Sequence, residues 1–345
     1  MSDHRSGAPE GASEDDEMAA GRGGNVTSPE SLVQLSGAPE EVWTPEAMEA
    51  ATPCNVIEVD EVDIAEAMRE ADGADAPEAG GADMDGAPPA EDADAQDGPD
   101  LQATRGGYDY PGPFTRDEVP GPYTAYPHRT VGKLFFKRGG GSFVCSASVI
   151  GGDAIWSAGH CLHAGNNRAD GWARDVVFAP AYKDGNAPLG LWKAKSLTVR
   201  TAWYKHGNPK GLYEDMGGAV LFPLNGRRIS AVCGYLGFAS GWSRYQHWRQ
   251  LGYPAAAPFD GRRMVEVASS FAYQGNVPGS PDPNATGNDM TGGSSGGPWV
   301  IDFGSRNRLN GNNSYRLSSR PKEMNSPYFG KSASSLYKQL RAAKA

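Results

Sequence analysis

The sequence has little that would hold it in a membrane or mark it for export. Its 345 residues contain no run of 18 or more apolar residues, so no segment is expected to span a bilayer. The first sixteen residues, MSDHRSGAPEGASEDD, have neither the basic start nor the apolar core of a signal peptide. No internal repeat is evident. These absences exclude a membrane-spanning chain and leave no visible export signal.

Basic and aromatic residues are almost missing from the first hundred positions. Residues 1–100 hold 27 acidic residues, three basic residues and a single aromatic residue, Trp43, for a net charge of -24. Such a segment, rich in Ala, Gly, Pro, Asp and Glu, buries too little apolar surface to offset the entropy lost on ordering. We therefore expect residues 1–105 to be mostly disordered, within an acidic low-complexity extension over 1–125.

The rest of the chain has the composition of a folded domain. Residues 101–345 carry a net charge of +14 and all the other aromatic residues. Short runs rich in Val, Ile, Phe, Tyr and Trp are separated by Gly, Pro, Asn and Asp, a pattern typical of β-strands in a sandwich or barrel. The runs are VGKLFF, SFVCSASVI, DAIW, DVVFAPAY, KSLTVRTAWY, GGAVLF, AVCGYLGF and MVEVAS. One helix is expected, over SASSLYKQLRAAK at the end.

A glycine-flanked serine is the first candidate for chemistry. Residues 291–298 read Thr-Gly-Gly-Ser-Ser-Gly-Gly-Pro. Glycines on both sides of Ser295 permit turns that other residues avoid, and they let a substrate come close. The amides of Gly293 and Ser295 could then point at one oxygen, as an oxyanion hole requires. In a chain with 46 glycines, a flexible loop is the alternative.

A histidine in a distinctive setting is the second candidate. Residues 156–161 read Trp-Ser-Ala-Gly-His-Cys, and Cys145 lies 16 positions before Cys161. A disulfide between these cysteines would close a loop of about 15 residues and pin the segment that carries His160, worth roughly 3 kcal/mol. A pair of reduced thiols is the alternative. The other five histidines have no comparable setting.

Together the two motifs resemble the trypsin/chymotrypsin family of serine peptidases. Ser-Ala-Gly-His-Cys, an upstream cysteine and a distant Gly-x-Ser-Gly-Gly-Pro are typical of the family. Asp-Met-Thr-Gly-Gly-Ser-Ser-Gly-Gly-Pro-Trp is typical of its bacterial trypsin-like and glutamyl-endopeptidase-like branch. The resemblance covers about 126–340. It implies an all-β fold of two antiparallel Greek-key barrels, over about 126–228 and 229–340, with a short C-terminal helix.

The family order His…Asp…Ser requires an aspartate between the two motifs. Seven lie there, and Asp215 fits best because Met-Gly-Gly-Ala-Val-Leu-Phe follows it, as in the family. The resemblance implies an endopeptidase with Ser295 as nucleophile, His160 as general base and Asp215 as the group that orients it. A solvated loop aspartate is the alternative for Asp215. No metal or cofactor is expected.

Two neighbouring positions bear on activation and specificity. Animal family members carry Asp where this chain has Ser294, so activation through a new N-terminal amine is not expected. The residue six before the nucleophile, Asp289, matches the base of the family's S1 pocket and implies a preference for basic P1 residues. Ser314 matches the strand that lines S1. Asn313 replaces the histidine of glutamyl endopeptidases, which argues against glutamate specificity.

The acidic extension has a candidate role of its own. EVWTPEAMEAATP, over 41–53, resembles the pro-regions of secreted bacterial relatives, and 31–42 and 57–68 have spaced apolar residues suited to docking. Opposite net charges also favour contact with the domain. A Cys54–Cys233 bridge is a hypothesis suggested by some animal relatives. A solubility tail is the alternative.

Several broader expectations follow from the resemblance. We expect a secreted or extracytoplasmic monomer that acts on protein or peptide substrates. A non-catalytic binding module is the alternative, although the complete set of motif residues argues against it. Nucleic-acid binding is not expected, because the basic residues are scattered and no motif appears. A lipase is disfavoured because that fold places serine before histidine.

Overall fold

The first sheet of the protein closes into a barrel. The computed structural model describes residues 24–33, 37–71 and 110–344. Six antiparallel strands pair in the order β9-β10-β7-β6-β5-β8, and β8 pairs back onto β9. Their bounds are β5 (Val131–Arg138), β6 (Gly141–Gly151), β7 (Ala154–Ser157), β8 (Arg174–Pro180), β9 (Trp192–Arg200) and β10 (Gly217–Leu221).

Alternating burial explains why these strands form a closed layer. Leu134 and Phe136 of β5 belong to one buried cluster, whereas Phe135 between them belongs to another on the opposite face. Successive side chains of a strand point to opposite faces, so the continuous apolar run places core on both sides. The barrel is therefore buried inside and also packed outside.

The second sheet follows in the chain and contributes the other half of the domain. Its strands pair in the order β11-β16-β15-β12-β13-β14-β18-β17, and β4 pairs with β13. The bounds are β4 (Phe114–Glu118), β11 (Gly237–Phe238), β12 (His247–Gly252), β13 (Val265–Gln274), β14 (Asn284–Gly287), β15 (Pro298–Ile301), β16 (Arg308–Asn312), β17 (Tyr315–Leu317) and β18 (Glu323–Ser326). The predicted β architecture is confirmed, and β4 extends the sheet to residues before the expected start at 126.

Helices are few and short in the domain. They are α5 (Gly159–Leu162), α6 (Thr201–His206), α7 (Ile229–Cys233) and α8 (Lys331–Ala342), with the 3₁₀ turns η3 (His128–Thr130), η4 (Ala169–Gly171) and η5 (Leu212–Glu214). The predicted C-terminal helix is α8, which buries Leu336 and Leu340. It packs on β10 so closely that a Cβ on Gly218 would lie 2.4 Å from Leu340 Cδ1.

Two predicted strands are right only in part, because KSLTVR ends β9 and the last two residues of AVCGYLGF form β11. The end of KSLTVRTAWY is α6, and the start of AVCGYLGF is α7. Short apolar runs fit a buried helical turn as well as a strand, so periodicity does not separate them. None of the helices within the described ranges has the length and apolar character needed to cross a bilayer.

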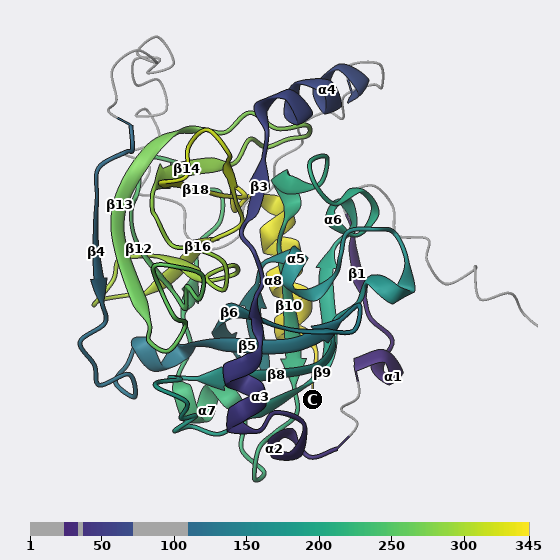
Figure 1. Cartoon of the computed structure of the whole chain (residues 1–345), viewed down its shortest axis with the longest axis vertical. Helices are drawn as coiled ribbons and strands as arrows, with labels where there is room; N and C mark the ends of the chain where they lie inside the picture. Colours follow the sequence, from purple (N-terminus) through teal and green to yellow (C-terminus); the bar gives the residue numbers. More distant parts are fainter. Residues whose placement is uncertain (1–23, 34–36, 72–109, 345) are drawn as a thin grey trace, which may run out of the picture.

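Part of the acidic extension is ordered against the domain. Its elements are β1 (Asn25–Thr27), α1 (Glu30–Val33), α2 (Pro39–Val42), α3 (Pro45–Ala50), β2 (Thr52–Pro53), β3 (Ile57–Val59) and α4 (Glu61–Ala71). Figure 1 shows this purple segment running between the two sheets, from α2 and α3 up to α4. The predicted disorder is wrong for these residues; residues 1–23 and 72–109 lie outside the described part.

Local sequence explains how the segment docks. Thr44 caps α3 by accepting a hydrogen bond from the Ala47 amide at 3.2 Å, and Pro45 occupies the first helical position. Trp43, just before this cap, is 1% exposed. Its indole N–H donates to the Asp175 carbonyl at 2.7 Å, and its ring lies 5.4 Å from that of Phe135.

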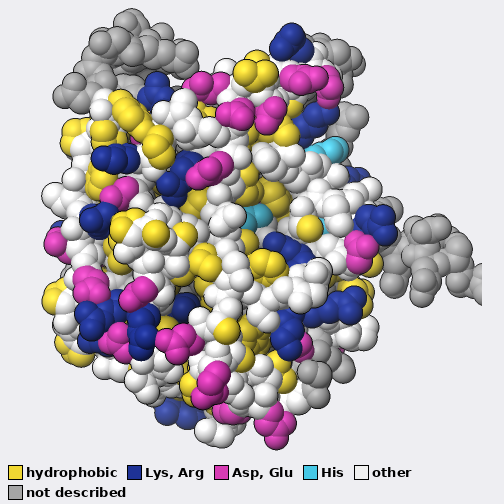
Figure 2. Space-filling view, in the orientation of Figure 1, with side chains coloured by type: hydrophobic (Ala, Val, Ile, Leu, Met, Phe, Trp, Pro, Cys, Tyr) yellow, Lys and Arg dark blue, Asp and Glu magenta, His cyan; other side chains and the backbone are white. Residues whose placement is uncertain are grey.

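Charged contacts also join the segment to the domain. Figure 2 shows acidic and basic side chains mixed over this face. Three segment carboxylates meet lysine or arginine of the domain: Glu49 with Arg262 at 2.7 Å, Glu70 with Lys210 at 2.6 Å and Glu30 with Lys195 at 3.6 Å. These pairs are exposed, so each contributes roughly 0–1 kcal/mol. Apolar burial therefore dominates the docking.

Candidate active site

A histidine and an aspartate meet in a buried contact between the two sheets. His160 Nδ1 lies 2.7 Å from Asp215 Oδ2, and the His160 amide donates to Asp215 Oδ1 at 2.7 Å. Asp215 is fully buried. With Nδ1–H donated to the carboxylate, Nε2 is the nitrogen left to accept a proton. The pair therefore has the geometry of a general base held in one tautomer.

Short turns bring these two groups together. His160 lies in α5, directly after β7, and Asp215 follows η5, just before β10. A Cβ on Gly159 would lie 2.8 Å from the Trp203 ring and 3.0 Å from Asp215 Oδ1. Glycine is therefore required before the histidine for the aspartate to reach it, which explains the Ala-Gly-His order.

Ser314 completes the surroundings of the aspartate. Its hydroxyl donates to Asp215 Oδ2 at 2.6 Å. The sequence assigned Ser314 only to the substrate-binding strand, so this second contact was missed. A lone serine before a strand gives no local signal of a partner 99 residues away.

Ser295 lies on a tight glycine turn next to α5. Gly293 has φ +92° and Gly296 has φ +79°, a region that other residues rarely adopt. A Cβ on Gly296 would lie 2.1 Å from Ser157 Oγ. The Ser295 carbonyl accepts from the Ser146 amide at 2.8 Å and lies 3.6 Å from Cys161 Sγ. Glycine is therefore required at position 293 by the backbone conformation, and at position 296 by both the conformation and the lack of space for a side chain.

The nucleophile and base candidates are both enclosed. Ser295 Oγ and His160 Nε2 are buried without a hydrogen-bond partner among the described residues. The His160 side chain is 7% exposed. Unsatisfied buried polar atoms are uncommon and often mark functional groups.

The predicted disulfide is present beside this site. Cys145 and Cys161 are bonded, and this bond fixes the start of α5 to β6. The hypothesis of a Cys54–Cys233 bridge is wrong, because both thiols are free and buried. Cys54 Sγ instead lies within 4.8 Å of Cys145 Sγ and a His160 ring nitrogen. Burial raises the pKa of the Cys54 thiol to about 11, so it stays protonated at neutral pH.

One amide of the expected oxyanion hole is already in use. Gly293 donates its N–H to the Cys54 carbonyl at 2.7 Å. Cys54 belongs to the ordered acidic segment, between β2 and β3. The segment therefore reaches the turn that carries Ser295.

Asp289 does not present an isolated negative charge to a substrate. Its Oδ2 accepts a hydrogen bond from Arg116 of β4, so a cation already offsets the carboxylate. The expectation of a basic P1 preference assumed a buried carboxylate without such a partner. The other oxygen, Asp289 Oδ1, is buried without a hydrogen-bond partner among the described residues, so the P1 preference stays a prediction.

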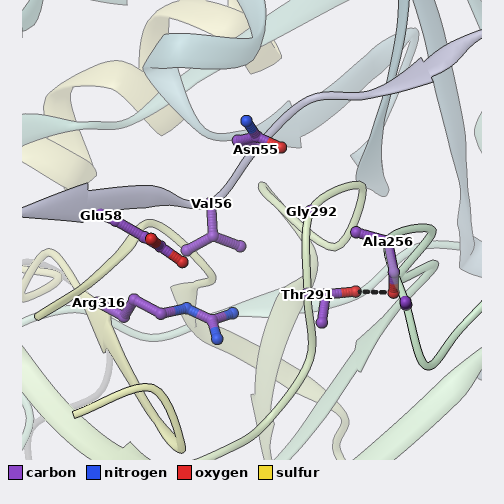
Figure 3. A pocket seen from close by; sticks show the side chains of 8 residues that line it. Asn55, Val56, Glu58, Ala256, Thr291, Gly292 and Arg316 are labelled. Atoms are coloured by element: carbon purple, nitrogen blue, oxygen red, sulfur yellow. Dashed lines mark hydrogen bonds between the residues drawn. The ribbon is translucent and has the colours of Figure 1, made fainter. Parts of the chain in front are cut away.

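An arginine lies in the neighbouring cavity. This cavity of about 210 Å³ is lined by Thr291, Gly292 and Arg316 from the domain and by Asn55, Val56 and Glu58 from the segment, as Figure 3 shows. Arg316 donates to the Pro321 carbonyl at 2.7 Å and to the Met290 carbonyl. Burial lowers the pKa of its guanidinium, and its Nε has no partner among the described residues. Sequence reasoning did not single out this residue.

Comparison with proteins of known structure finds similar proteases. No protein-family model and no curated protein matches the chain. Protease Anisep from Arthrobacter nicotinovorans is similar at 32% identity and TM-score 0.59, over 66% of this chain and 100% of that one. The thermostable serine protease AL20 from an extremophilic microorganism is similar at 34% identity and TM-score 0.57, over 62% of this chain and 98% of that one.

A Glu endopeptidase shares the fold at 16% identity and TM-score 0.50, over 66% of this chain and 97% of that one. The matches to the first two enzymes span essentially their whole length at more than 30% identity. The chain thus belongs to the trypsin/chymotrypsin-like serine proteases, a family of serine-type endopeptidases.

Proposed function

We propose that the protein hydrolyses peptide bonds through an acyl-enzyme on Ser295. The observation that carries the proposal is the buried His160–Asp215 contact of 2.7 Å, which commits Nδ1 to the carboxylate and leaves Nε2 as the base. The glycine turn beside it holds the Ser295 hydroxyl, which forms no hydrogen bond with His160 or with any other described residue in this structure. Nucleophile, base and orienting group are then all supplied by this chain.

In this proposal Ser295 Oγ attacks the scissile carbonyl carbon while His160 Nε2 takes its proton. The carbonyl oxygen becomes an oxyanion that accepts hydrogen bonds from the amides of Gly293 and Ser295. His160 then gives the proton to the leaving amine, and the C–N bond breaks to leave an ester on Ser295. Water, deprotonated by His160, hydrolyses the ester and restores the hydroxyl. Asp215 stabilises the imidazolium throughout.

Labelling with a fluorophosphonate tests the nucleophile. The probe bonds irreversibly to an activated serine. Labelled protein therefore accumulates during long incubation of the full chain, even if the enclosed site opens only briefly. We expect the label on Ser295, none in Ser295→Ala, and labelling retained in Ser294→Ala, the adjacent serine that serves as control. An unlabelled wild type and Ser294→Ala would instead favour a non-catalytic binding module.

The P1 preference stays a prediction. Asp289 is the reason to expect basic residues, but Arg116 faces it and Arg316 adds positive charge to the cavity nearby. Chromogenic peptides that differ only in Arg, Lys, Glu or Phe at P1 measure the preference. If the Asp289 carboxylate binds the P1 side chain, Asp289→Asn should lower kcat/KM only for the Arg and Lys peptides. If the carboxylate only stabilises β4, the substitution should change kcat/KM equally for all four peptides.

We also propose that the protein works outside the cytoplasm. The Cys145–Cys161 disulfide is fully buried next to the candidate base. Disulfides of this kind persist in oxidising compartments. Fractionation of the producing cells tests the location, and a purely cytoplasmic protein with reduced Cys145 and Cys161 would contradict it.

A further inference from the structure

The segment from Thr52 to Val59 crosses the candidate active site and joins both sheets. β2 pairs in parallel with Phe143 and Val144 of β6 in the first barrel. β3 pairs in parallel with β17 at the edge of the second sheet. The residues between these pairings, 54–56, pass the turn that carries Ser295.

We propose that Thr52–Val59 is an intramolecular inhibitor that fills the cleft in the direction opposite to a cleavable substrate. The proposal rests on the function proposed above and names how that site is regulated. It explains why Ser295 Oγ and His160 Nε2 are sealed from solvent in the full chain.

The segment occupies one amide of the expected oxyanion hole. The Gly293 amide donates to the Cys54 carbonyl at 2.7 Å, and the Cys54 amide donates to the Val144 carbonyl at 2.9 Å. A substrate carbonyl needs the Gly293 amide for stabilisation of its oxyanion. Segment and substrate therefore exclude each other at this amide.

The direction of the segment across the site differs from the direction that cleavage requires. A peptide is cleaved when the amine that leaves faces the base, because His160 must protonate it. At Cys54 the group beside His160 is the thiol on the acyl side of the Cys54–Asn55 bond, within 4.8 Å of a ring nitrogen. Asn55, which carries the amine, lies instead against Gly292, whose added Cβ would be 3.2 Å from Asn55 Cα. The thiol, and not the amine, is the group placed beside the base, and we infer that the bond survives for this reason.

An apolar side chain of the segment, Val56, is buried against the second sheet. Val56 is 4% exposed and belongs to a buried cluster with Trp299 and Met324 of the second sheet. Figure 3 shows its side chain pointing from the segment toward the side of the cavity where Arg316 and Thr291 lie. Burial of a lysine at this position would remove water from its ammonium group, and Arg316 would repel it, although the Glu58 carboxylate lines the same cavity.

The substitution Val56→Lys in the full chain tests the proposal. Its matched control is Val62→Lys, which makes the same change at a site of α4 that is 71% exposed. We expect the rate of fluorophosphonate labelling to rise at least tenfold in Val56→Lys and to stay at the wild-type rate in Val62→Lys. Equal rates in all three proteins would overturn the inhibitory role.

A second measurement follows docking without using catalysis. Cys54 and Cys233 are the free thiols among the four cysteines. Release of the segment returns Cys54 to water and to an ordinary thiol pKa, so alkylation at pH 8 should accelerate by more than about 100-fold. Cys233 is fully buried, and its continued protection shows that the variant is folded.

The combined outcomes separate the two proposals. Faster alkylation of Cys54 without any phosphonate labelling would contradict the proposed enzyme activity while confirming that the segment is released. Phosphonate labelling that is fast in wild type despite a protected Cys54 would overturn the inhibitory role and leave the enzyme intact. Unchanged alkylation of Cys54 in Val56→Lys would contradict the anchoring role of Val56.

The direction is tested with a peptide of residues 48–62 added to the Val56→Lys protein. We expect it to slow hydrolysis of a chromogenic substrate and to remain intact by mass spectrometry after many turnovers of that substrate. The same peptide with Val56→Lys serves as control and should not inhibit. Cleavage between Cys54 and Asn55 would overturn the reversed orientation.

Discussion

Glu214 is expected to be one of the most sensitive positions for stability, although it takes no part in the proposed chemistry. It accepts hydrogen bonds from Arg200 Nε at 3.2 Å and from Arg200 Nη2 at 3.0 Å, which makes a two-bond ion pair. The side chains of Arg200 and Glu214 are 1% and 7% exposed. Arg200 also donates to Asn25 Oδ1 of β1 at 2.6 Å.

The substitution Glu214→Gln keeps the shape of the side chain and removes the negative charge facing Arg200. Loss of one partner from a buried ion pair costs about 3–5 kcal/mol, because the other charge stays in a poorly solvated site. We therefore expect the free energy of unfolding to fall by about that amount. Urea unfolding at pH 7, followed by tryptophan fluorescence, measures it.

The control is an exposed pair in the same molecule. Lys210 Nζ lies 2.6 Å from Glu70 Oε2, and the two side chains are 45% and 58% exposed. Lys210→Met should cost less than about 1 kcal/mol, since water screens such pairs. A loss below about 1 kcal/mol for Glu214→Gln as well would refute the reasoning that burial sets the size of the effect.

Three further predictions concern the site and its supports. Asp215→Asn should lower kcat by roughly 10⁴-fold with little change in fold, because the amide favours the wrong tautomer of His160; a loss under tenfold in peptide hydrolysis would contradict this. Replacing Cys145 and Cys161 by Ser should lower the free energy of unfolding by about 3 kcal/mol in urea titration, and an equally stable variant would count against the loop-entropy argument. Burial lowers the pKa of His163 to about 4, below its ordinary value of 6.5. The unfolded chain therefore binds the proton first, so stability should fall as pH drops from about 6.5 towards 4, and His163→Gln should flatten this slope in unfolding titrations; an unchanged slope would argue against it.

Much of the candidate site could be predicted because its signals are local. Gly159 and Gly296 stand where a Cβ would collide with Asp215 or Ser157, so the chemistry leaves a glycine pattern next to each reactive residue. The contact between Ser314 and Asp215 and the position of Arg316 depend on how distant strands meet. The residues next to Ser314 and Arg316 in the sequence give no sign of this contact or of this position.

The prediction that residues 1–105 are mostly disordered came from average composition, whereas the spaced apolar residues of 31–42 and 57–68 suggested docking. Trp43, Met48, Val59 and Ile64 are each at most 6% exposed because the folded domain offers surfaces for them. The segment by itself could not bury these side chains. The segment is ordered only because the folded domain contacts it, and the composition of the segment alone does not describe this contact.

The passage of one short segment over both sheets has a consequence for how the molecule matures. β2 can pair only when β6 is formed, and β3 can pair only when β17 is formed. If either sheet is unfolded, the chain cannot hold Thr52–Val59 in place. The segment can therefore dock only after both sheets have formed. If the segment closes the cleft as proposed, closure requires both sheets to be folded, and an added protease should find the segment protected only in fully folded molecules.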